Sequence, residues 1–216
     1  MLFSTCTCIK KLNTLPYELE YDVSKLNLKY EALEDVRKDI ISCRLCDLCK
    51  SRKNAVPGEG GIHAKIMFIG EAPGRLEDEK GRPFVGTAGR ILDEVLDKVG
   101  IRRSEVFITN IVKCRPPANR IPTDEERNMC RQFLDTEIKL VSPKIICILG
   151  RTALNSIIGG AGKSIMQSRG KFINHNFAKY FLTIHPAAII YNPKLRIVLE
   201  KDLAILSEEC QKIGLI

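Results

Sequence analysis

The sequence predicts an α/β protein, specifically a three-layer α/β/α sandwich with a central four-stranded parallel sheet. Four short apolar runs are bounded by glycine, proline or charged residues, which is typical of strands buried on both faces. Segments with helical spacing of apolar residues separate these runs, and parallel neighbours need such crossovers. The chain has 216 residues, of which 44% are hydrophobic, and this suits one compact domain with an extension.

The first 40 residues carry no strong strand pattern, and we expect them to form an N-terminal extension that leads into a helix. Tyr30 to Ile41 has helical spacing, with Val36 and Ile40 among the residues on one face. Residues 41–216 are then expected to form the α/β domain, which begins in a segment rich in basic and turn residues.

The four predicted strands are Lys65 to Gly70, Val106 to Val112, Lys144 to Gly150 and Lys179 to Ile184. The predicted helices between them are Ala88 to Val99, Thr123 to Leu140 and Arg151 to Ile158. Thr123 precedes three acidic residues, which favours an N-cap with an acidic first turn. In an open α/β sheet the ligand lies beyond the carboxyl ends of the strands. The residues that follow each strand are therefore candidates for one pocket.

The charge balance favours a polyanionic partner such as DNA or RNA. Lysine and arginine number 34 against 26 acidic residues, a net charge of +8. The alternative is a basic surface that serves solubility alone. Basic residues that cluster near the predicted strand ends fit phosphate contacts. They are Arg75, Lys80, Arg82, Lys113, Arg115, Arg120, Lys163, Arg169 and Lys171.

We expect a cytoplasmic monomer with no membrane partner, because no secretory leader opens the sequence and no apolar run reaches membrane-spanning length. A sliding clamp is a possible partner, although no convincing clamp-binding motif supports it. In a reducing compartment, nine cysteines indicate a metal site rather than a disulfide framework, with the intracellular proteins of hyperthermophiles as an exception.

Four of the cysteines form the candidate metal site. Cys43 and Cys46 are two residues apart, Cys114 follows the second predicted strand, and Cys130 falls in a helical pattern with polar neighbours. Thiolate sets of this kind hold zinc or an iron–sulfur cluster, and the spacing alone does not choose between them. The remaining cysteines are interpreted as free or buried thiols. They are Cys6, Cys8, Cys49, Cys147 and Cys210.

Polar residues at the strand ends suggest a site for a planar ligand. The turn from Gly70 to Gly74 lets backbone amides approach such a ligand. Asn110 can offer a donor and an acceptor side by side to a base edge, or it can simply bond nearby backbone. His185 can donate to a developing anion. Phe84, in a glycine-flanked loop, is a candidate for stacking, with an ordinary core aromatic as the alternative.

Three segments in this order, GEAPGRLEDEKGRPFVGTAG, TNIVKCRPPANR and HPAAIIYNP, make the chain similar to the family 4 uracil-DNA glycosylases of bacteria and archaea, over about residues 43 to 206. The resemblance implies the uracil-DNA glycosylase fold and an enzyme of base excision repair. Such enzymes flip uracil out of single- or double-stranded DNA and hydrolyse the N-glycosidic bond, which releases uracil and leaves an abasic site. It also implies a [4Fe-4S] cluster held by Cys43, Cys46, Cys114 and Cys130.

By the same resemblance, the residues that bind uracil are Glu71, Ala72, Pro73, Phe84, Asn110 and His185. Phe84 would stack on the ring, Asn110 would pair with the uracil edge, and His185 would donate to O2. Phe84 or its neighbours would exclude the 5-methyl group of thymine. The base that activates water stays open. The best-studied glycosylases of the superfamily have an aspartate where this chain has Ala72, so we expect Glu71 or Glu77 to serve, or a dissociative path that needs little base assistance.

The segment that begins at His185 matches the loop that wedges into DNA in this superfamily. Ile189 or Ile190 is the expected wedge, and Tyr191 stands where many relatives carry arginine. One competing hypothesis is a zinc-stapled nucleic-acid-binding module without catalysis. Another is a glycosylase of changed scope, acting on other deaminated bases or trapping its product covalently. Relatives that trap their product carry a basic, histidine-containing insertion that is absent after Arg115.

Overall fold

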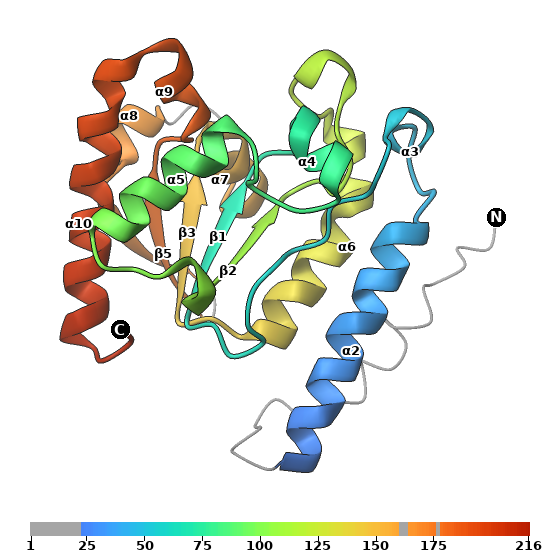
Figure 1. The fold of residues 1–216 in the computed structure, drawn as a ribbon, viewed down its shortest axis with the longest axis horizontal. Helices are drawn as coiled ribbons and strands as arrows, with labels where there is room; N and C mark the ends of the chain where they lie inside the picture. The colour runs from blue at the N-terminus through green and yellow to red at the C-terminus, as the bar shows by residue number, and fades with distance from the viewer. Residues whose placement is uncertain (1–22, 160–163, 176–177) are drawn as a thin grey trace.

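The computed structural model describes residues 23–159, 164–175 and 178–216, and it contains a five-stranded sheet with helices on both faces (Figure 1). The strands are β1 (Ile66–Gly70), β2 (Val106–Asn110), β3 (Ile145–Leu149), β4 (Lys171–His175) and β5 (Ala178–Thr183). They lie in the order β2-β1-β3-β5-β4. The first four are parallel to their neighbours, and β4 runs antiparallel to β5.

The longer helices of the described chain are α2 (Val23–Ser42), α5 (Thr87–Lys98), α6 (Asp124–Val141) and α10 (Arg196–Lys212). The shorter ones are α3 (Leu48–Ser51), α4 (Arg75–Lys80), η1 (Arg103–Glu105), η2 (Pro117–Asn119), α7 (Arg151–Ile157), α8 (Ile165–Ser168), α9 (Ala187–Tyr191) and η3 (Pro193–Leu195). No helix in this part of the chain is long and apolar enough to span a membrane. The start of the predicted N-terminal extension, with Cys6 and Cys8, lies outside the described residues, and so does Lys163.

The predicted four-stranded parallel sheet is confirmed in β1, β2, β3 and β5, each within two residues of its expected ends. The edge strand β4 was not predicted. Its sequence, KFINH, lacks the apolar run of a central strand because an edge strand is buried less completely than its neighbours. Phe172 on β4 packs against Phe181 on β5, with ring centroids 4.7 Å apart, and this contact supports the hairpin.

Two apolar cores lie on opposite faces of the sheet and define the three layers. Met67 and Ile69 of β1 belong to the core that also contains residues of α2, α6 and α7. Ile66 and Phe68 belong to the core under α5 and α10. This alternation follows from the two-residue period of a strand, and each fully buried large apolar side chain stabilises the fold by about 1.5–3 kcal/mol.

The helix α6 starts where the sequence predicts. The Thr123 hydroxyl accepts from the backbone N–H of Glu126 at 3.2 Å, and Glu126 Oε2 accepts from the N–H of Thr123 at 2.8 Å. This reciprocal capping satisfies two of the free donors at the helix start. Helix α2 packs beside α6 (Figure 1), with Val36 and Ile40 buried between them. The end of α2 therefore lies next to the helix that carries Cys130.

Candidate active site

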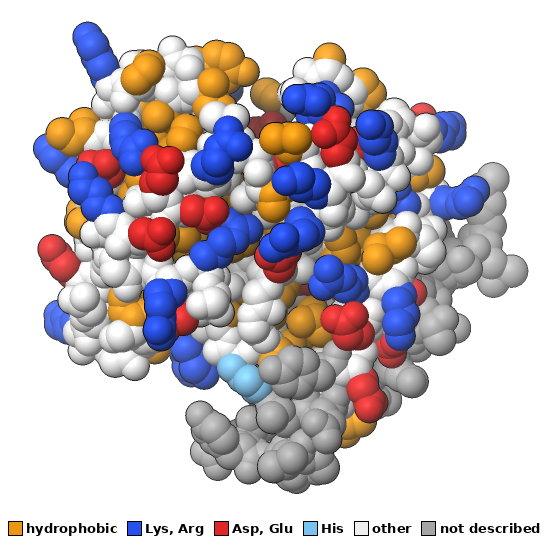
Figure 2. All heavy atoms as spheres, viewed as in Figure 1, with side chains coloured by type: hydrophobic (Ala, Val, Ile, Leu, Met, Phe, Trp, Pro, Cys, Tyr) orange, Lys and Arg blue, Asp and Glu red, His pale blue; other side chains and the backbone are white. Residues whose placement is uncertain are grey.

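A pocket lies beyond the carboxyl ends of β1, β2 and β5, where Figure 2 shows a notch at the upper edge of the molecule. The strand order brings these ends together, as expected for a parallel sheet. All residues predicted to border the ligand line this pocket, namely Glu71, Ala72, Pro73, Phe84, Asn110 and His185. Three segments distant in the sequence thus form one site.

Asn110 is the last residue of β2 and lies opposite Gly70 in the register of β1. It is 1% exposed, and its Oδ1 atom has no hydrogen-bond partner among the described residues. A Cβ atom at Gly70 would stand 2.5 Å from Oδ1 and 2.6 Å from Phe84 Cζ, so glycine is what lets both side chains approach the strand end. A buried acceptor without a donor costs about 1–3 kcal/mol, and a ligand that donates to Oδ1 would recover this energy.

His185 presents a neutral donor to the same pocket. Its Nδ1 accepts from the backbone N–H of Ala187 at 3.1 Å, which assigns the ring hydrogen to Nε2. The Nε2 atom is buried and has no partner in the described part of the chain. Burial lowers the pKa of His185 to about 4, so the imidazole is uncharged at neutral pH.

The ring centroids of Phe84 and His185 lie 5.7 Å apart. The backbone of Phe84 has an unusual conformation, with φ of +51°. Such a conformation strains a bulky residue. Two features hold it in place. Arg103 donates to the carbonyl oxygens of Pro83 and Phe84 at 2.8 and 3.2 Å. Gly89 on α5 leaves room for the loop, because a Cβ there would stand 1.9 Å from the Phe84 oxygen.

Glu77 and Glu71, the two carboxylates considered as bases, have different surroundings. Glu77 Oε1 accepts from the N–H groups of Val85 and Gly86 at 2.9 and 2.6 Å, and Oε2 accepts from that of Gly74 at 3.1 Å. Glu77 therefore ties the Phe84 loop to the turn after β1, with both oxygens engaged. The Glu71 carboxylate lines the pocket and makes no hydrogen bond or ion pair with any residue that the structure describes.

The expected wedge residues, in the loop and short helix after β5, differ in exposure. Ile189 is 6% exposed and packs in the core under α5 and α10, which favours Ile190 of the two expected wedge residues. Ile190 and Tyr191 line the mouth of the pocket, and Tyr191 is 89% exposed. These two side chains are free to meet a DNA strand.

Some of the basic residues expected to contact phosphate are buried, and others are accessible. Lys113 is buried in an ion pair with Glu137, so its predicted phosphate contact is wrong. Arg169 is largely covered and pairs with the buried Asp202. Arg75 and Arg120 line the pocket and stay accessible. On the face seen in Figure 2, lysine and arginine side chains spread widely between fewer acidic ones.

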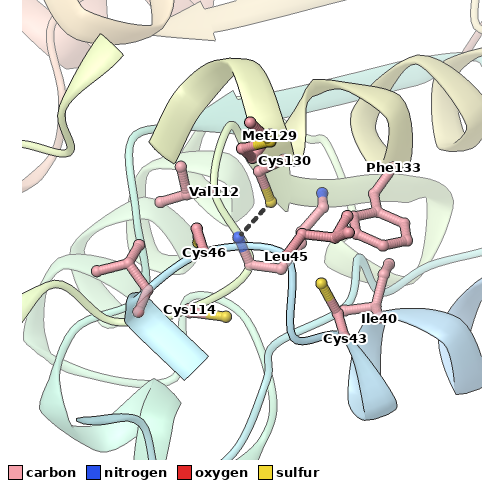
Figure 3. A pocket seen from close by; sticks show the side chains of 11 residues that line it. Ile40, Cys43, Leu45, Cys46, Val112, Cys114, Met129, Cys130 and Phe133 are labelled. Carbon is pink, nitrogen blue, oxygen red and sulfur yellow. Dashed lines mark hydrogen bonds between the residues drawn. The ribbon is translucent and has the colours of Figure 1, made fainter. Parts of the chain in front are cut away.

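Cys43, Cys46, Cys114 and Cys130 line a second pocket, shown in Figure 3, between the end of α2, the loop after β2 and α6. The sulfur atoms of Cys43, Cys114 and Cys130 point toward the space between these elements (Figure 3). Leu45, Met129 and Phe133 surround them. Among the residues that the structure describes, no three histidine, cysteine or acidic side chains converge closely enough to hold a single metal ion.

Cys43 and Cys46 are half-buried, whereas Cys114 and Cys130 are buried. Burial raises the pKa of all four thiols, that of Cys114 to about 11 and that of Cys130 to about 12. Without a metal they are neutral, and metal binding would deprotonate them. Arg52 donates from Nη1 to the Cys114 sulfur at 2.8 Å and from Nη2 to the carbonyl oxygens of Ile41 and Cys43. A cation and amide donors beside the sulfurs are suited to thiolate ligands.

Sequence patterns did not reveal several residues that organise the site. Arg52, Arg103 and Glu137 make their contacts with residues 9 to 79 positions away, so no local spacing signals them. Cys147 in β3 and Cys210 in α10 are fully buried, as expected for thiols that pack as small apolar groups.

Comparison with known proteins assigns this fold and its strand-end pocket to a family. Residues 57–206 match the model of the uracil DNA glycosylase superfamily. The type-4 uracil-DNA glycosylase of Sulfurisphaera tokodaii is 46% identical over 82% of this chain and 84% of its own. That of Archaeoglobus fulgidus is 43% identical over 84% of this chain and 95% of its own. The type-4 uracil-DNA glycosylase of Saccharolobus solfataricus is 45% identical over 82% of this chain and 85% of its own.

The model match covers more than half of the chain, and these relatives align with most of it. The chain therefore belongs to the type-4 uracil-DNA glycosylase family of the uracil-DNA glycosylase superfamily.

Proposed function

We propose that the protein is a DNA repair glycosylase that removes uracil from single- or double-stranded DNA, working as a monomer through its domain of residues 41–216. One observation carries the proposal most strongly. The pocket at the strand ends contains two buried polar atoms that have no partner among the described residues, Asn110 Oδ1 and His185 Nε2, beside the ring of Phe84. An acceptor, a donor and an apolar ring face match the edge, the O2 atom and the face of a uracil base.

Asn110 accounts for the choice of base. Uracil carries a donor at N3 beside an acceptor at O4, and an amide oriented with Oδ1 toward N3 complements this pair. Cytosine presents an acceptor and a donor in the reverse order, so it would leave buried groups unpaired. A site built to hydrogen-bond one pattern rejects the other strongly because of those unpaired groups. Thymine is excluded by the Phe84 side of the pocket, which we propose leaves no room for a 5-methyl group.

His185 supports the chemical step. The bond between deoxyribose C1′ and uracil N1 breaks, its electron pair leaves with the base, and a water oxygen bonds to C1′. The water loses a proton to solvent, and the departing uracil anion takes one up, so free uracil and an abasic site result. As the bond breaks, negative charge spreads to uracil O2. A fixed, neutral Nε2–H donor strengthens its hydrogen bond as that charge grows, and one such donor contributes about 10²–10³-fold in rate.

Glu71 is the carboxylate that we propose orients the water. It lines the pocket, and its oxygens are not engaged by described neighbours, whereas those of Glu77 hold three backbone N–H groups. Glu77 instead contributes by holding Phe84 in place. A path in which the base departs before water attacks would ask only modest assistance from Glu71.

Cys43, Cys46, Cys114 and Cys130 fit a [4Fe-4S] cluster, which we propose they hold. A cube takes one thiolate at each of its four irons, so its ligands surround a pocket rather than meet at one point. The four cysteines come from the segment between α2 and α3, the loop after β2, and α6. When bound, the cluster would join these elements; the chemistry of uracil removal needs only the residues of the other pocket.

Ile190 and Tyr191 are the proposed contacts with the DNA stack. Flipping a base leaves a gap, and an apolar or aromatic side chain that fills it offsets part of the unstacking energy. Both residues are exposed beside the base pocket, as this task requires.

Incubation with an oligonucleotide containing one uracil, followed by alkaline cleavage of abasic sites, tests the proposal. We expect strand scission with a single-stranded substrate and with a U:G duplex, and none with the same sequences containing cytosine. Intact uracil substrates after incubation with iron-replete protein would refute the proposed activity. Metal analysis of the same preparation should find about four irons per chain. Stoichiometric zinc without iron would instead favour the binding-module hypothesis.

A further inference from the structure

Lys113 is a buried lysine three residues beyond Asn110, and the proposed reaction gives it no task. Its side chain and that of Glu137 on α6 are each 2% exposed, and Nζ lies 2.6 Å from Glu137 Oε2. A buried ion pair is often no more stabilising than apolar side chains of the same size. Stability alone therefore does not account for this pair.

The ammonium group of Lys113 holds the end of β2. Its three protons have three acceptors: Thr109 Oγ1 at 2.6 Å, the backbone oxygen of Asn110 at 2.9 Å, and Glu137 Oε2 at 2.6 Å. The Thr109 hydroxyl donates to Glu137 Oε2 at 2.7 Å, and the Gly58 N–H donates to Oε1 at 2.8 Å. Every polar group of this network has a partner, which makes it rigid.

The backbone of Lys113 is fixed as well. Its N–H donates to the sulfur of Cys130 at 3.2 Å, the bond drawn as a dashed line in Figure 3. Its carbonyl oxygen accepts from the N–H of Val56 at 2.7 Å. Lys113 is thus held at the cysteine pocket by its main chain, and it contacts the carbonyl group of Asn110 with its side chain.

We propose that Lys113 and Glu137 are positioning residues, which set the peptide plane of Asn110 and thereby aim its amide at the uracil edge. The proposal rests on the function proposed above. Without the ammonium donor, the Asn110 carbonyl is free to rotate, and Oδ1 shifts relative to Gly70 and Phe84. Because the contact is made to Asn110 and not to DNA, its loss affects base binding and cleavage but leaves DNA affinity unchanged.

The double variant Lys113→Met/Glu137→Gln isolates this contact. Methionine replaces the lysine stem without charge. The glutamine carbonyl still accepts from the N–H of Gly58, and its NH2 group can donate to the Thr109 hydroxyl. Of the oxygens that accept from the ammonium, only the Asn110 carbonyl is left without a donor, while the Thr109 hydroxyl hydrogen loses its acceptor on residue 137. Thr136→Val is the matched control, since Thr136 is the neighbour of Glu137 on α6 and its hydroxyl, among the described residues, bonds within that helix, to Gln132 O at 2.7 Å.

Three quantities are measured on iron-replete protein: the single-turnover rate of uracil release, inhibition by free uracil, and the Kd for uncleaved DNA. In the double variant we expect release to slow and inhibition by uracil to weaken, each by about tenfold, the worth of one hydrogen bond. The Kd for DNA and the iron content should match those of the wild type. The control should match it in every respect.

The proposal is overturned if the double variant releases uracil within twofold of the wild-type rate, or if DNA affinity falls as much as the rate does. If this variant does not fold, Thr109→Val decides. It preserves side-chain shape and removes one Lys113 acceptor, so slower release with unchanged DNA affinity supports the proposal and a wild-type rate overturns it. Failure of the proposed function is distinguishable, because then the wild type itself would release no uracil.

Discussion

At the residue scale, His185 illustrates how burial selects a chemical role. A histidine in water is partly charged near neutral pH, but burial lowers the pKa of His185 to about 4 and the Ala187 N–H fixes its tautomer. A neutral donor can strengthen a bond to a developing anion without giving up its proton. Its strength as a donor should therefore persist throughout the neutral range.

His185 gives a pH dependence with a definite sign. Its folded pKa of about 4 lies below the ordinary value of 6.5, so the unfolded chain binds more protons between these values. The contribution of His185 to stability is complete above pH 6.5 and is lost as the pH falls toward 4. Relative to His185→Gln, the wild type should lose about 2–3 kcal/mol of unfolding free energy over that interval.

Urea unfolding of the two proteins at several pH values checks this, with neutral pH as the internal reference. In the same pH series, titration of His185 should not affect kcat/KM near pH 6.5. Any inflection that the wild type shows there should therefore also be present in His185→Gln. Parallel stability curves for the two proteins would contradict a buried neutral imidazole.

Replacing Glu71 and Glu77 in turn by glutamine should have different effects on the rate and on the melting temperature. Glu71→Gln is expected to slow uracil release by about 10²-fold or more with little change in melting temperature, because the Glu71 carboxylate makes no hydrogen bond with a described residue. Glu77→Gln should lower the melting temperature, because an amide NH2 must face backbone N–H groups. Single-turnover rates and thermal unfolding of both variants decide the matter. A destabilised Glu71→Gln protein, or a stable Glu77→Gln protein with a lost rate, would reverse the assignment.

At the scale of elements, the central strands and main crossover helices followed from the sequence, because apolar runs and helical spacing are local signals. Thr123 as the cap of α6 and the pocket residues at the strand ends were predictable for the same reason. The edge strand β4, with three polar residues among five, was not predictable from local pattern. Local pattern also could not show that Ile189 turns into the core or that Lys113 turns away from solvent, since both depend on what packs against the loop.

Helix α5 and the Phe84 loop fit together through one glycine, and this gives a test of the strained residue. Alanine ordinarily stabilises a helix by about 1 kcal/mol relative to glycine. Gly89→Ala should nevertheless destabilise the protein, because the new Cβ would stand 1.9 Å from the Phe84 oxygen. Displacement of Phe84 should also weaken inhibition by free uracil.

Melting temperature and uracil inhibition are compared with those of Gly61→Ala, a position with open space around it. The control should behave as the wild type. A Gly89→Ala protein as stable and active as the control would show that Phe84 does not need the contact with α5.

At the scale of the whole molecule, the cysteine pocket joins the end of α2 to the elements that carry the base-reading strand. Arg52 contributes to this junction, because one guanidinium bonds both the Cys114 sulfur and the carbonyls at the end of α2. The cysteine pocket and the pocket at the strand ends are therefore separate in their residues and adjacent in the structure.

Arg52→Met should shorten the time for which the protein retains its iron. The variant removes the hydrogen bonds to Cys114, Ile41 and Cys43 and preserves the apolar stem, so a loss would reflect those bonds. Iron release into a chelator is followed by absorbance, with Lys53→Met as the control for removal of an exposed charge next to Arg52. Equal release rates for both variants and the wild type would exclude this role for Arg52.

The central claim is that one pocket, through Asn110 and His185, reads uracil and promotes its removal from DNA. It is tested most directly by single-turnover release of the base from oligonucleotides that differ only in carrying uracil, cytosine or thymine. We predict release of uracil alone, with a rate lowered at least about 100-fold in Asn110→Ala and in His185→Ala and with nearly unchanged DNA affinity. Comparable release of cytosine or thymine, or variants as fast as the wild type, would contradict the account.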